Sequence, residues 1–379
     1  MPALDDILQQ KLQLLESKQR RRILRTTHRQ AGSQVERGGN KLISFSCNDY
    51  LGLSQHPDVV AASQAALAQY GAGAAASRLV TGNYPLYDEL EASLAAYKGT
   101  AAACVFGSGF LANIGIIPAL VGPGDLIIAD KLVHASMIDA IRLSGANFQR
   151  FAHNNMEHCA MLLEENRAQY QQCLILTETV FSMDGDRAPL VELQALAERY
   201  DAWLMVDDAH GLGVVPQSDM QCGPSVIQMG TLSKAVGSYG GYVCGSQVLI
   251  DYLQTAARSV IYSTGLPPSA VAASITGLRI IENDPACCQK PLQHARYFTQ
   301  LLGLAEAQSA IVPVIIGESE KAVAASARLE AEGFLVAAIR PPTVPENSAR
   351  LRFAFSALHT HAQIEAVAHL VQQEIPACE

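Results

Sequence analysis

The sequence predicts an α/β protein whose large domain is built on a mostly parallel β-sheet. Short apolar runs alternate with stretches of helical periodicity between residues 101 and 245. Runs that are apolar throughout are typical of parallel strands whose two faces are both covered by helices. The chain has 379 residues, of which 49% are hydrophobic and 17% charged, and this suits a large core and a division into two domains.

Seven of the apolar runs are predicted to be strands of the large domain. They are Ala102–Phe106, Leu126–Ala129, Asn147–Phe151, Cys173–Thr177, Trp203–Asp207, Ser225–Met229 and Gly241–Cys244. Open parallel sheets bind ligands beyond the carboxyl ends of their strands. The residues that directly follow each run are therefore the candidates for function.

The first 47 residues are predicted to form a separate N-terminal segment of helix and strand. Leucine and isoleucine recur at helical spacing from Leu4 to Leu15, and residues 42–45 alternate like a strand. Between them lies a basic cluster from Lys18 to Arg29. This cluster is either a solvated helix face or a place where an arginine meets an anionic substrate.

The large domain is expected over residues 48–275. It begins with helical patterns at Pro57–Tyr70 and Tyr84–Tyr97, and small residues fill the loop Gly71–Gly82 between them. Such a loop lets a ligand approach the backbone closely, or it is simply a flexible connection.

A small α+β domain is expected over residues 276–379. Its pattern is a second and shorter alternation of strands and helices. The predicted elements are strands at Ile311–Ile316, Leu335–Val336 and Arg350–Phe355, a helix through Leu329 and a final helix to Ile375.

Charge, cysteine content and hydropathy exclude several classes of protein. The net charge of −9 argues against a nucleic-acid partner. The nine cysteines are odd in number and form no CxxC pair, which favours reduced thiols in a cytoplasm over disulfides or a metal site. Asp5 and Asp6 stand where a secretory signal would be basic, and no apolar run reaches the ~18 residues that span a bilayer. We therefore expect a cytoplasmic protein that binds neither membrane nor metal.

Lys234 directly follows the sixth predicted strand, in the tract Thr231-Leu-Ser-Lys234. Burial or a neighbouring cation lowers the pKa of a lysine readily, and the neutral amine can form a Schiff base with a carbonyl. Taken alone, however, the tract would also suit a surface lysine at the end of a strand.

A glycine turn and a carboxylate–histidine pair follow two other strands. Gly107–Phe110 opens a helix, and backbone N–H groups at such a turn can bind a phosphate. Asp207 and His210 lie in Asp207-Asp-Ala-His-Gly211, where only one of the two adjacent carboxylates can face a site because side chains alternate along an extended chain. Helix capping and structural hydrogen bonding are the alternatives for these residues.

His134, Glu178 and Ser182 also lie just after predicted strands. All these groups would meet at one edge of the sheet, in front of Lys234. A phosphate site, a carboxylate, histidines and a lysine amine are together what pyridoxal 5′-phosphate requires. The sequence therefore predicts this cofactor.

With these residues in view, the chain resembles the α-oxoamine synthases, which are pyridoxal-phosphate enzymes of the aspartate-aminotransferase-like fold, fold type I. The resemblance extends from about Leu42 to the last helix. It is carried by Ser46–Leu53, Val206–Gly211, Thr231–Lys234 and Ile261–Thr264.

Three further tracts favour one branch of this family. Phe181–Asp186, Ala338–Pro345 and Ala349–Arg352 resemble the branch that condenses L-alanine with a pimeloyl thioester, carried by coenzyme A or by acyl carrier protein. A sibling branch that uses glycine and makes 2-amino-3-oxobutyrate or 5-aminolevulinate is the nearest alternative. A non-catalytic binding protein of the same fold would be favoured by loss of Lys234 or Asp207, and both are present.

The resemblance implies roles around the cofactor ring for five residues. Lys234 would bind the cofactor as a Schiff base and act as the catalytic base, and Asp207 would pair with the ring nitrogen. His134 would stack on the ring, while His210 and Ser182 would lie near its phenolic oxygen.

The resemblance also implies residues for the phosphate and for the substrates. Gly109, Phe110 and Thr231 would hold the phosphate, and Thr264 would reach the phosphate of the partner subunit in a homodimer with shared active sites. The implied substrate-binding residues are Arg25, Asn48, His134, Arg340, Thr343 and Arg352, with the arginines at 20–22 as alternatives to Arg25.

The chain departs from the family pattern at two places. Ala74–Ala76 stands where the family usually has glycine and serine, and Leu212 stands where threonine is common. Both positions are expected to affect how the acyl thioester is held, and neither removes a group that the cofactor needs.

Overall fold

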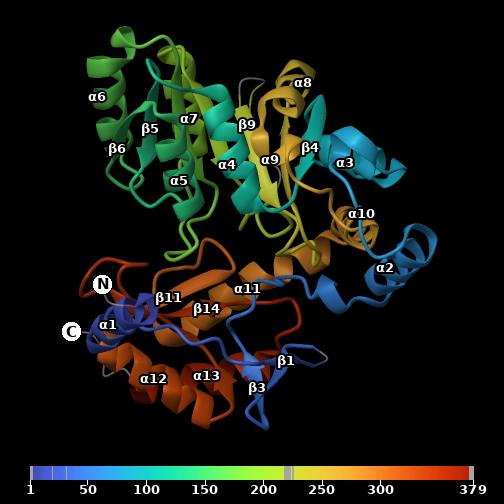
Figure 1. The fold of residues 1–379 in the computed structure, drawn as a ribbon. Coiled ribbons are helices and arrows are strands. Elements are labelled where there is room, and N and C mark those ends of the chain that lie inside the picture. Colours follow the sequence, from blue (N-terminus) through green and yellow to red (C-terminus); the bar gives the residue numbers. More distant parts are fainter. Residues whose placement is uncertain (1–2, 19, 31, 217–222, 224–225, 375–379) are drawn as a thin grey trace. The chain divides into compact units, whose positions relative to one another are not determined.

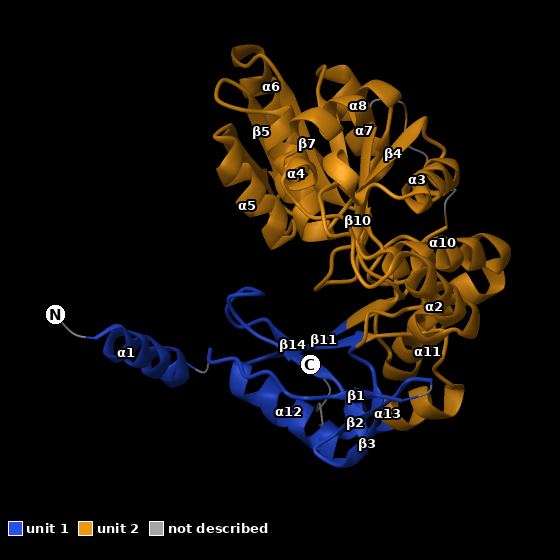
Figure 2. Cartoon of the chain, turned by 45° about the vertical axis from the view of Figure 1, so that its right-hand side comes forward, with its two compact units in different colours: residues 1–46, 313–353, 369–379 blue, residues 47–312, 354–368 orange. Residues whose placement is uncertain are grey.

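The computed structural model describes residues 3–18, 20–30, 32–216, 223 and 226–374 (Figure 1). The chain forms two compact units (Figure 2). Unit 1 comprises Met1–Ser46, Pro313–Phe353 and His369–Glu379, and unit 2 comprises Cys47–Val312 and Ala354–Ala368. Compactness alone does not test where independently folding domains end, so the boundaries after residues 47 and 275 stay a prediction.

Unit 2 is built on a seven-stranded sheet with the order β4-β10-β9-β8-β7-β5-β6. Only β10 runs antiparallel to its neighbours, β4 and β9, and the other pairs are parallel. The strands are β4 (Ala102–Phe106), β5 (Leu126–Asp130), β6 (Asn147–Phe151), β7 (Cys173–Glu178), β8 (Trp203–Asp207), β9 (Val226–Thr231) and β10 (Gly241–Gly245). The predicted mostly parallel α/β sheet is therefore confirmed. Ser225, the first residue of the sixth predicted strand, lies outside the described residues.

Helices cover both faces of this sheet, as the continuous apolar strands require. In β5, Ile127 and Ala129 join one core, whereas Leu126 and Ile128 join the other. The first core is completed by α4 (Gly109–Leu120), α5 (Ala135–Ser144), α8 (Gln247–Ala256) and α9 (Arg258–Ile261). The second is completed by α6 (Met156–Asn166) and α7 (Leu190–Arg199).

A third core lies where the remaining helices of unit 2 meet β4 and β10. It includes side chains of α3 (Pro85–Lys98) and α10 (Pro268–Asn283), and α2 (Pro57–Tyr70) packs against α10. The bounds of α2 are those predicted from its sequence pattern. α10 leads into α11 (Pro285–Leu302), which ends at Gly303.

Unit 1 contains two smaller sheets. The first has the order β1-β2-β3-β12, and β12 (Phe334–Leu335) pairs parallel with β3 (Asn40–Ser44). The second has the order β11-β14-β13 and confirms a small sheet formed by the C-terminal region. The remaining elements are β1 (His28–Arg29), β2 (Gln34–Arg37), β11 (Ile311–Gly317), β13 (Ala337–Ile339), β14 (Ala349–Ala354), α1 (Leu4–Ser17) and α12 (Ser319–Ala331). The last helix, α13 (His361–Glu374), belongs to unit 2 as far as Ala368 and to unit 1 from His369.

No helix in the described part of the chain is long and apolar enough to cross a membrane. Among the same residues, no three His, Cys, Asp or Glu side chains are grouped as a metal ion would need. The seven cysteines that the structure describes are all free thiols.

A buried ion pair joins α3 to the end of β8. The Lys98 ammonium donates to Asp208 Oδ2, and both side chains are fully buried. The Asp208 amide donates to the Met229 carbonyl at 2.7 Å, which places this carboxylate beside β9. Asp208 thus points into the interior, where Lys98 balances its charge.

Replacing Lys98 by methionine is expected to destabilise the protein strongly. The substitution leaves the Asp208 carboxylate buried without a cation, and breaking a buried pair in this way costs about 3–5 kcal/mol of the free energy of unfolding. Denaturant unfolding of the variant measures this loss. The matched control is Lys321→Met, because that lysine is 67% exposed and pairs with Glu318 on the surface; it should change stability by about 0.5 kcal/mol or less. Equal effects of the two substitutions would contradict the role of the pair.

Candidate active site

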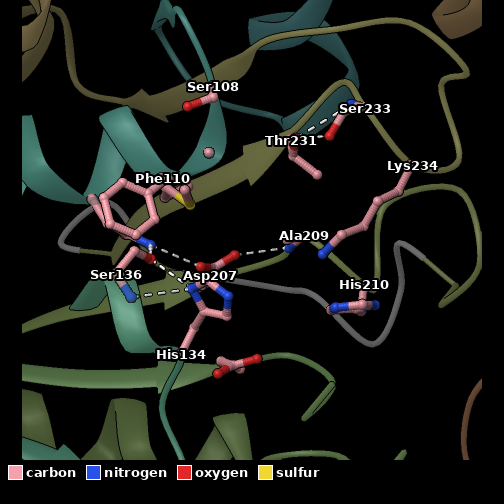
Figure 3. Close-up of a pocket in the computed structure, with 14 residues that line it drawn as sticks. Ser108, Phe110, His134, Ser136, Asp207, Ala209, His210, Thr231, Ser233 and Lys234 are labelled. Atoms are coloured by element: carbon pink, nitrogen blue, oxygen red, sulfur yellow. Dashed lines mark hydrogen bonds between the residues drawn. The ribbon is translucent and has the colours of Figure 1, made fainter. Parts of the chain in front are cut away.

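The turns that follow five parallel strands of unit 2 line one cavity (Figure 3). The lining residues are Ser108, Gly109, Phe110, Asn113, His134, Ser136, Glu178, Asp207, Ala209, His210, Met229, Thr231, Ser233 and Lys234. The cavity lies at the carboxyl ends of the strands, where the fold class places ligands. The structure thus brings together seven predicted cofactor residues, namely Gly109, Phe110, His134, Asp207, His210, Thr231 and Lys234.

One wall of the cavity is the amino end of α4. Ser108 caps this helix, its Oγ accepting from the Leu111 amide at 3.1 Å. The first N–H groups of a helix have no partner within it, so those of Gly109 and Phe110 form a site for an anion. A Cβ at Gly241 would lie 2.4 Å from the Ser108 carbonyl oxygen, so only glycine lets β10 approach this turn closely.

The turn after β9 provides Thr231, Ser233 and Lys234. Thr231 Oγ1 donates to the Gly240 carbonyl at 2.8 Å and lies 2.8 Å from Ser233 Oγ, which fixes the turn between the two strands. The Lys234 side chain is half-buried and extends into the cavity toward Ala209 (Figure 3). An amine is therefore held in front of the helix terminus and the end of β8.

Asp207 is the carboxylate that faces the cavity. It is 5% exposed, its Oδ2 accepts from Asn113 Nδ2 at 3.0 Å, and its Oδ1 accepts from the Ala209 amide at 2.9 Å. These two hydrogen bonds fix the orientation of the carboxyl group toward the cavity. Because Asp208 turns away to Lys98, the prediction that only one of the adjacent carboxylates faces the site is correct.

A chain of hydrogen bonds links Asp207 to His134. Asn113 also donates to Ser136 Oγ at 2.9 Å, and Ser136 Oγ lies 2.7 Å from His134 Nδ1, which accepts from the Ser136 amide. This pattern makes Nδ1 an acceptor, so the proton of the neutral ring is on Nε2. Burial, and then the charge of Lys234, lower the pKa of His134, while Asp207 partly opposes them. The imidazole is therefore uncharged at neutral pH.

Glu178 is a second carboxyl group in the cavity and is only 3% exposed. Burial, and then the charge of Asp207, raise its pKa well above the ordinary value, against the opposing effect of Lys234. Its Oε1 has no hydrogen-bond partner among the described residues. Burial beside a second carboxyl group therefore favours the protonated form of Glu178.

His210 is oriented by a tyrosine that the sequence did not single out. Tyr50 is completely buried, and its hydroxyl lies 2.7 Å from His210 Nδ1. The same hydroxyl donates to Asn48 Oδ1 at 3.3 Å. The predicted substrate residue Asn48 is thereby connected to the cavity through Tyr50 and His210.

Two predicted cofactor residues do not line this cavity. Ser182 lies in the turn after β7, and Thr264 lines a separate small cavity with Arg78 and Gly265. A backbone bridge pairs Thr264 with Ser77, which lies in the small-residue loop Gly71–Gly82. Within that loop Ala75 has a φ of 58°, a left-handed conformation that glycine adopts more readily. Leu212, the other departure, is 2% exposed in the core.

The remaining predicted substrate residues belong to unit 1. A cavity of about 600 Å³ in this unit is lined by residues 20–25 and 338–343, which include Arg25, Arg340 and Thr343. Arg22, one of the alternatives to Arg25, donates to Thr343 Oγ1 at 3.2 Å. Arg25 lies 3.7 Å from Glu330 instead. Arg352 is 6% exposed within β14.

Asn113, Ser136 and Tyr50 are site residues that sequence reasoning did not assign. Asn113 carried a usable signal, because it is the one polar side chain in the otherwise apolar helix Gly109–Leu120. Tyr50 stands in a polar turn and Ser136 in the first turn of α5, and nothing in the local pattern marks either of them. The sequence placed Glu178 just after a predicted strand, at the edge that carries the site. Its raised pKa follows from burial, which the sequence does not display.

Comparison with known proteins places the chain in a family. Residues 40–371 match the family described as aminotransferase class I and II. The chain is 55% identical over 375 residues to an 8-amino-7-oxononanoate synthase of Methylobacterium nodulans, with 98% of this chain and 97% of the relative covered. It is 56% identical over 369 residues to the same enzyme of Methylobacterium sp. strain 4-46, with 97% and 96% covered.

Solved structures agree with these matches. A serine palmitoyltransferase from S. paucimobilis, solved with a bound PLP-myriocin aldimine, has a TM-score of 0.89 at 30% identity and covers 97% of this chain and 96% of its own. An 8-amino-7-oxononanoate synthase from Francisella tularensis has a TM-score of 0.75 at 27% identity, with 88% and 97% covered.

Substitution of the two buried carboxyl groups is expected to have unequal effects. Glu178→Gln replaces a protonated acid by its neutral isostere and should change kcat by about threefold or less. Asp207→Asn removes the charge and should lower kcat about 10- to 150-fold, the value of a hydrogen bond to a charged group. Steady-state kinetics of the two purified variants measure this difference. A greater loss for Glu178→Gln would reverse the assignment of charge.

Proposed function

The chain belongs to the class I and II aminotransferase family and has 8-amino-7-oxononanoate synthase activity, a step of biotin biosynthesis, and from this premise we propose its substrates and the work of each residue. The substrates are L-alanine and a pimeloyl thioester. A bond forms between Cα of alanine and the thioester carbonyl carbon, the thiol carrier leaves, and the alanine carboxyl group is lost as carbon dioxide. The observation that carries this proposal is the cavity that joins Lys234, Asp207 and the amino end of α4.

Pyridoxal 5′-phosphate is the cofactor, and the cavity has a group for each part of it. Gly109 and Phe110 at the amino end of α4, with Thr231, would hold the phosphate. Asp207 would pair with the ring nitrogen, and neutral His134 would stack on the ring without repelling its positive charge. When bound, the cofactor supplies an electron sink for the electrons left when alanine loses its Cα proton.

Side chains of the protein would transfer and hold protons around the bound cofactor. Lys234 would hold the cofactor through its amine, and the same amine would take the Cα proton of alanine as a general base. Asp207, oriented by Asn113 and the Ala209 amide, would accept a hydrogen bond from the ring nitrogen and so hold its proton. His210, oriented by Tyr50, and Ser182 would hydrogen-bond the phenolic oxygen.

Asn48 and Arg352 would bind the alanine carboxylate. The acyl donor would meet the basic residues of unit 1, where Arg22 contacts Thr343 and where Arg25 and Arg340 line the same cavity. Arginines suit an anionic partner, and both coenzyme A and acyl carrier protein are anionic. We infer a pimeloyl thioester of either carrier as the donor.

We also infer a homodimer with shared active sites in the cytoplasm. Thr264 lies in a separate cavity, in keeping with a role toward the phosphate bound by the partner subunit, as the resemblance to the α-oxoamine synthases implies. The free thiols of the described cysteines fit a reducing compartment.

One assay tests the choice of substrates. Release of carbon dioxide from carboxyl-labelled alanine or glycine is measured with the purified enzyme and a pimeloyl or an acetyl thioester. We expect turnover with alanine and pimeloyl thioester to exceed the other combinations by at least tenfold, about 1.4 kcal/mol of discrimination. A preference for glycine with the acetyl thioester would instead identify a sibling synthase. Running the assay with pimeloyl-coenzyme A and with pimeloyl-acyl carrier protein shows which carrier the enzyme uses.

Arg352→Ala is expected to raise the KM for alanine about 10- to 150-fold. Loss of a charge-assisted hydrogen bond costs about 1.5–3 kcal/mol of binding free energy. Arg352→Lys keeps the charge but not the paired N–H groups of the guanidinium, so its KM should fall between those of the parent and Arg352→Ala. If KM is unchanged in both variants, the carboxylate binds elsewhere.

A further inference from the structure

A histidine outside the cavity joins two of the turns that line or adjoin it. His153 follows β6, and its Nδ1 lies 2.9 Å from Asp130 Oδ1 at the end of β5. Its Nε2 lies 2.7 Å from Asp186 Oδ2 in the turn after β7. Asp130 is completely buried, and the side chains of His153 and Asp186 are 24% and 30% exposed.

The geometry requires a charged imidazolium. Both ring nitrogens face carboxylate oxygens, which only accept, so both must donate. Burial lowers the pKa of His153, but its hydrogen bonds to Asp130 and Asp186 and the charges of the two carboxylates outweigh that effect and raise the pKa to about 10. The folded-state pKa is raised, so the cation is present through the neutral range and is lost as the pH rises through about 10.

On one side, the Asp130 carboxylate begins the turn that ends at His134. Its Oδ1 also accepts from the Leu132 amide at 2.8 Å, and its Oδ2 accepts from the Asn154 amide at 2.8 Å. His134 then caps α5 and faces the cavity. The position of this turn therefore depends on where the Asp130 carboxylate is held.

On the other side, Asp186 closes the turn that carries Ser182. The Phe181 amide donates to the Asp186 carbonyl at 3.0 Å, and the Gly185 amide donates to the Phe181 carbonyl at 2.8 Å. The ring of Phe181 packs edge-on against His153, with 4.4 Å between centroids. Asn154 Nδ2 donates to Asp186 Oδ2 at 3.0 Å and to the Arg187 carbonyl at 3.1 Å.

We propose that His153 is a positioning residue, whose imidazolium ties the turn bearing Ser182 to the turn bearing His134 and so sets both side chains for the cofactor. This inference rests on the proposed roles of Ser182 and His134. A neutral side chain cannot serve in the same way, because it would leave the carboxylates of Asp130 and Asp186 facing each other without a cation between them.

The test compares His153→Gln with the matched control His158→Gln in the full-length enzyme. His158 lies on the following helix, α6, and its ring accepts only from the Ala152 amide in the same segment. Amide hydrogen exchange is measured with and without pyridoxal phosphate, alongside the Kd for the cofactor and kcat. We expect His153→Gln to speed hydrogen exchange at least tenfold in residues 131–134 and 181–187 but not in β4. The same substitution should weaken cofactor binding and lower kcat about 10- to 100-fold, because small misplacements of reacting groups have effects of this size. His158→Gln should match the parent protein.

A double substitution separates the effect of losing the imidazolium charge from the effect of changed packing. Asp186→Asn removes one of the two carboxylates, so in the His153→Gln background it should recover part of the exchange protection and of kcat. Additive losses from the two substitutions would overturn the proposal. A second outcome would also overturn the proposal. In that outcome His153→Gln lowers the thermal midpoint, but hydrogen exchange in the two turns, the cofactor Kd and kcat all stay within twofold of the parent values.

The same measurements also show whether the proposed function, rather than the link between the two turns, is wrong. If exchange in both turns responds as expected while cofactor Kd and kcat do not change, the tie between the turns exists, and the roles given to Ser182 and His134 are wrong. That outcome overturns the inference as stated. If the parent enzyme shows no synthase turnover, the proposed substrates fail, and exchange and cofactor Kd alone decide the inference.

Discussion

The buried negative charge of Asp207 is the constraint on which the rest of unit 2 depends. A carboxylate that is 5% exposed is costly unless donors surround it and the charges of neighbouring carboxyl groups are balanced. Asn113 and the Ala209 amide supply the donors, Glu178 gives up its own charge, and the adjacent Asp208 is balanced by Lys98. Asp207 thus faces the cavity that the Lys234 amine also lines.

The sequence was sufficient for the large sheet and for most of the cofactor site. Parallel strands buried on both faces are apolar throughout, so the runs stood out, and the residues after them gathered at one edge because parallel strands share a direction. The reversed direction of β10 could not be foreseen, since an isolated five-residue run does not encode its partner. Asn113 and Tyr50 act through hydrogen bonds across separate elements, which no local pattern displays.

Unit 1 was harder to predict because its sheets combine the two ends of the chain. Strand β3 pairs with β12, which follows it by almost three hundred residues, and Arg22 meets Thr343 in the same way. Spacing in the sequence cannot show which of the four neighbouring arginines contacts Thr343, because that threonine lies far from them in the sequence. Arg22 contacts Thr343 and Arg25 lies 3.7 Å from Glu330, while both line the same cavity, so the role of Arg25 stays a prediction.

The central claim is that Lys234 is the amine that holds the cofactor in the cavity of unit 2. Reduction of the purified, cofactor-loaded enzyme with borohydride makes that bond permanent, and peptide mapping by mass spectrometry then locates it. The account predicts a pyridoxyl group on the peptide that contains Lys234. A pyridoxyl group on another lysine, such as Lys131, with Lys234 unmodified would contradict it.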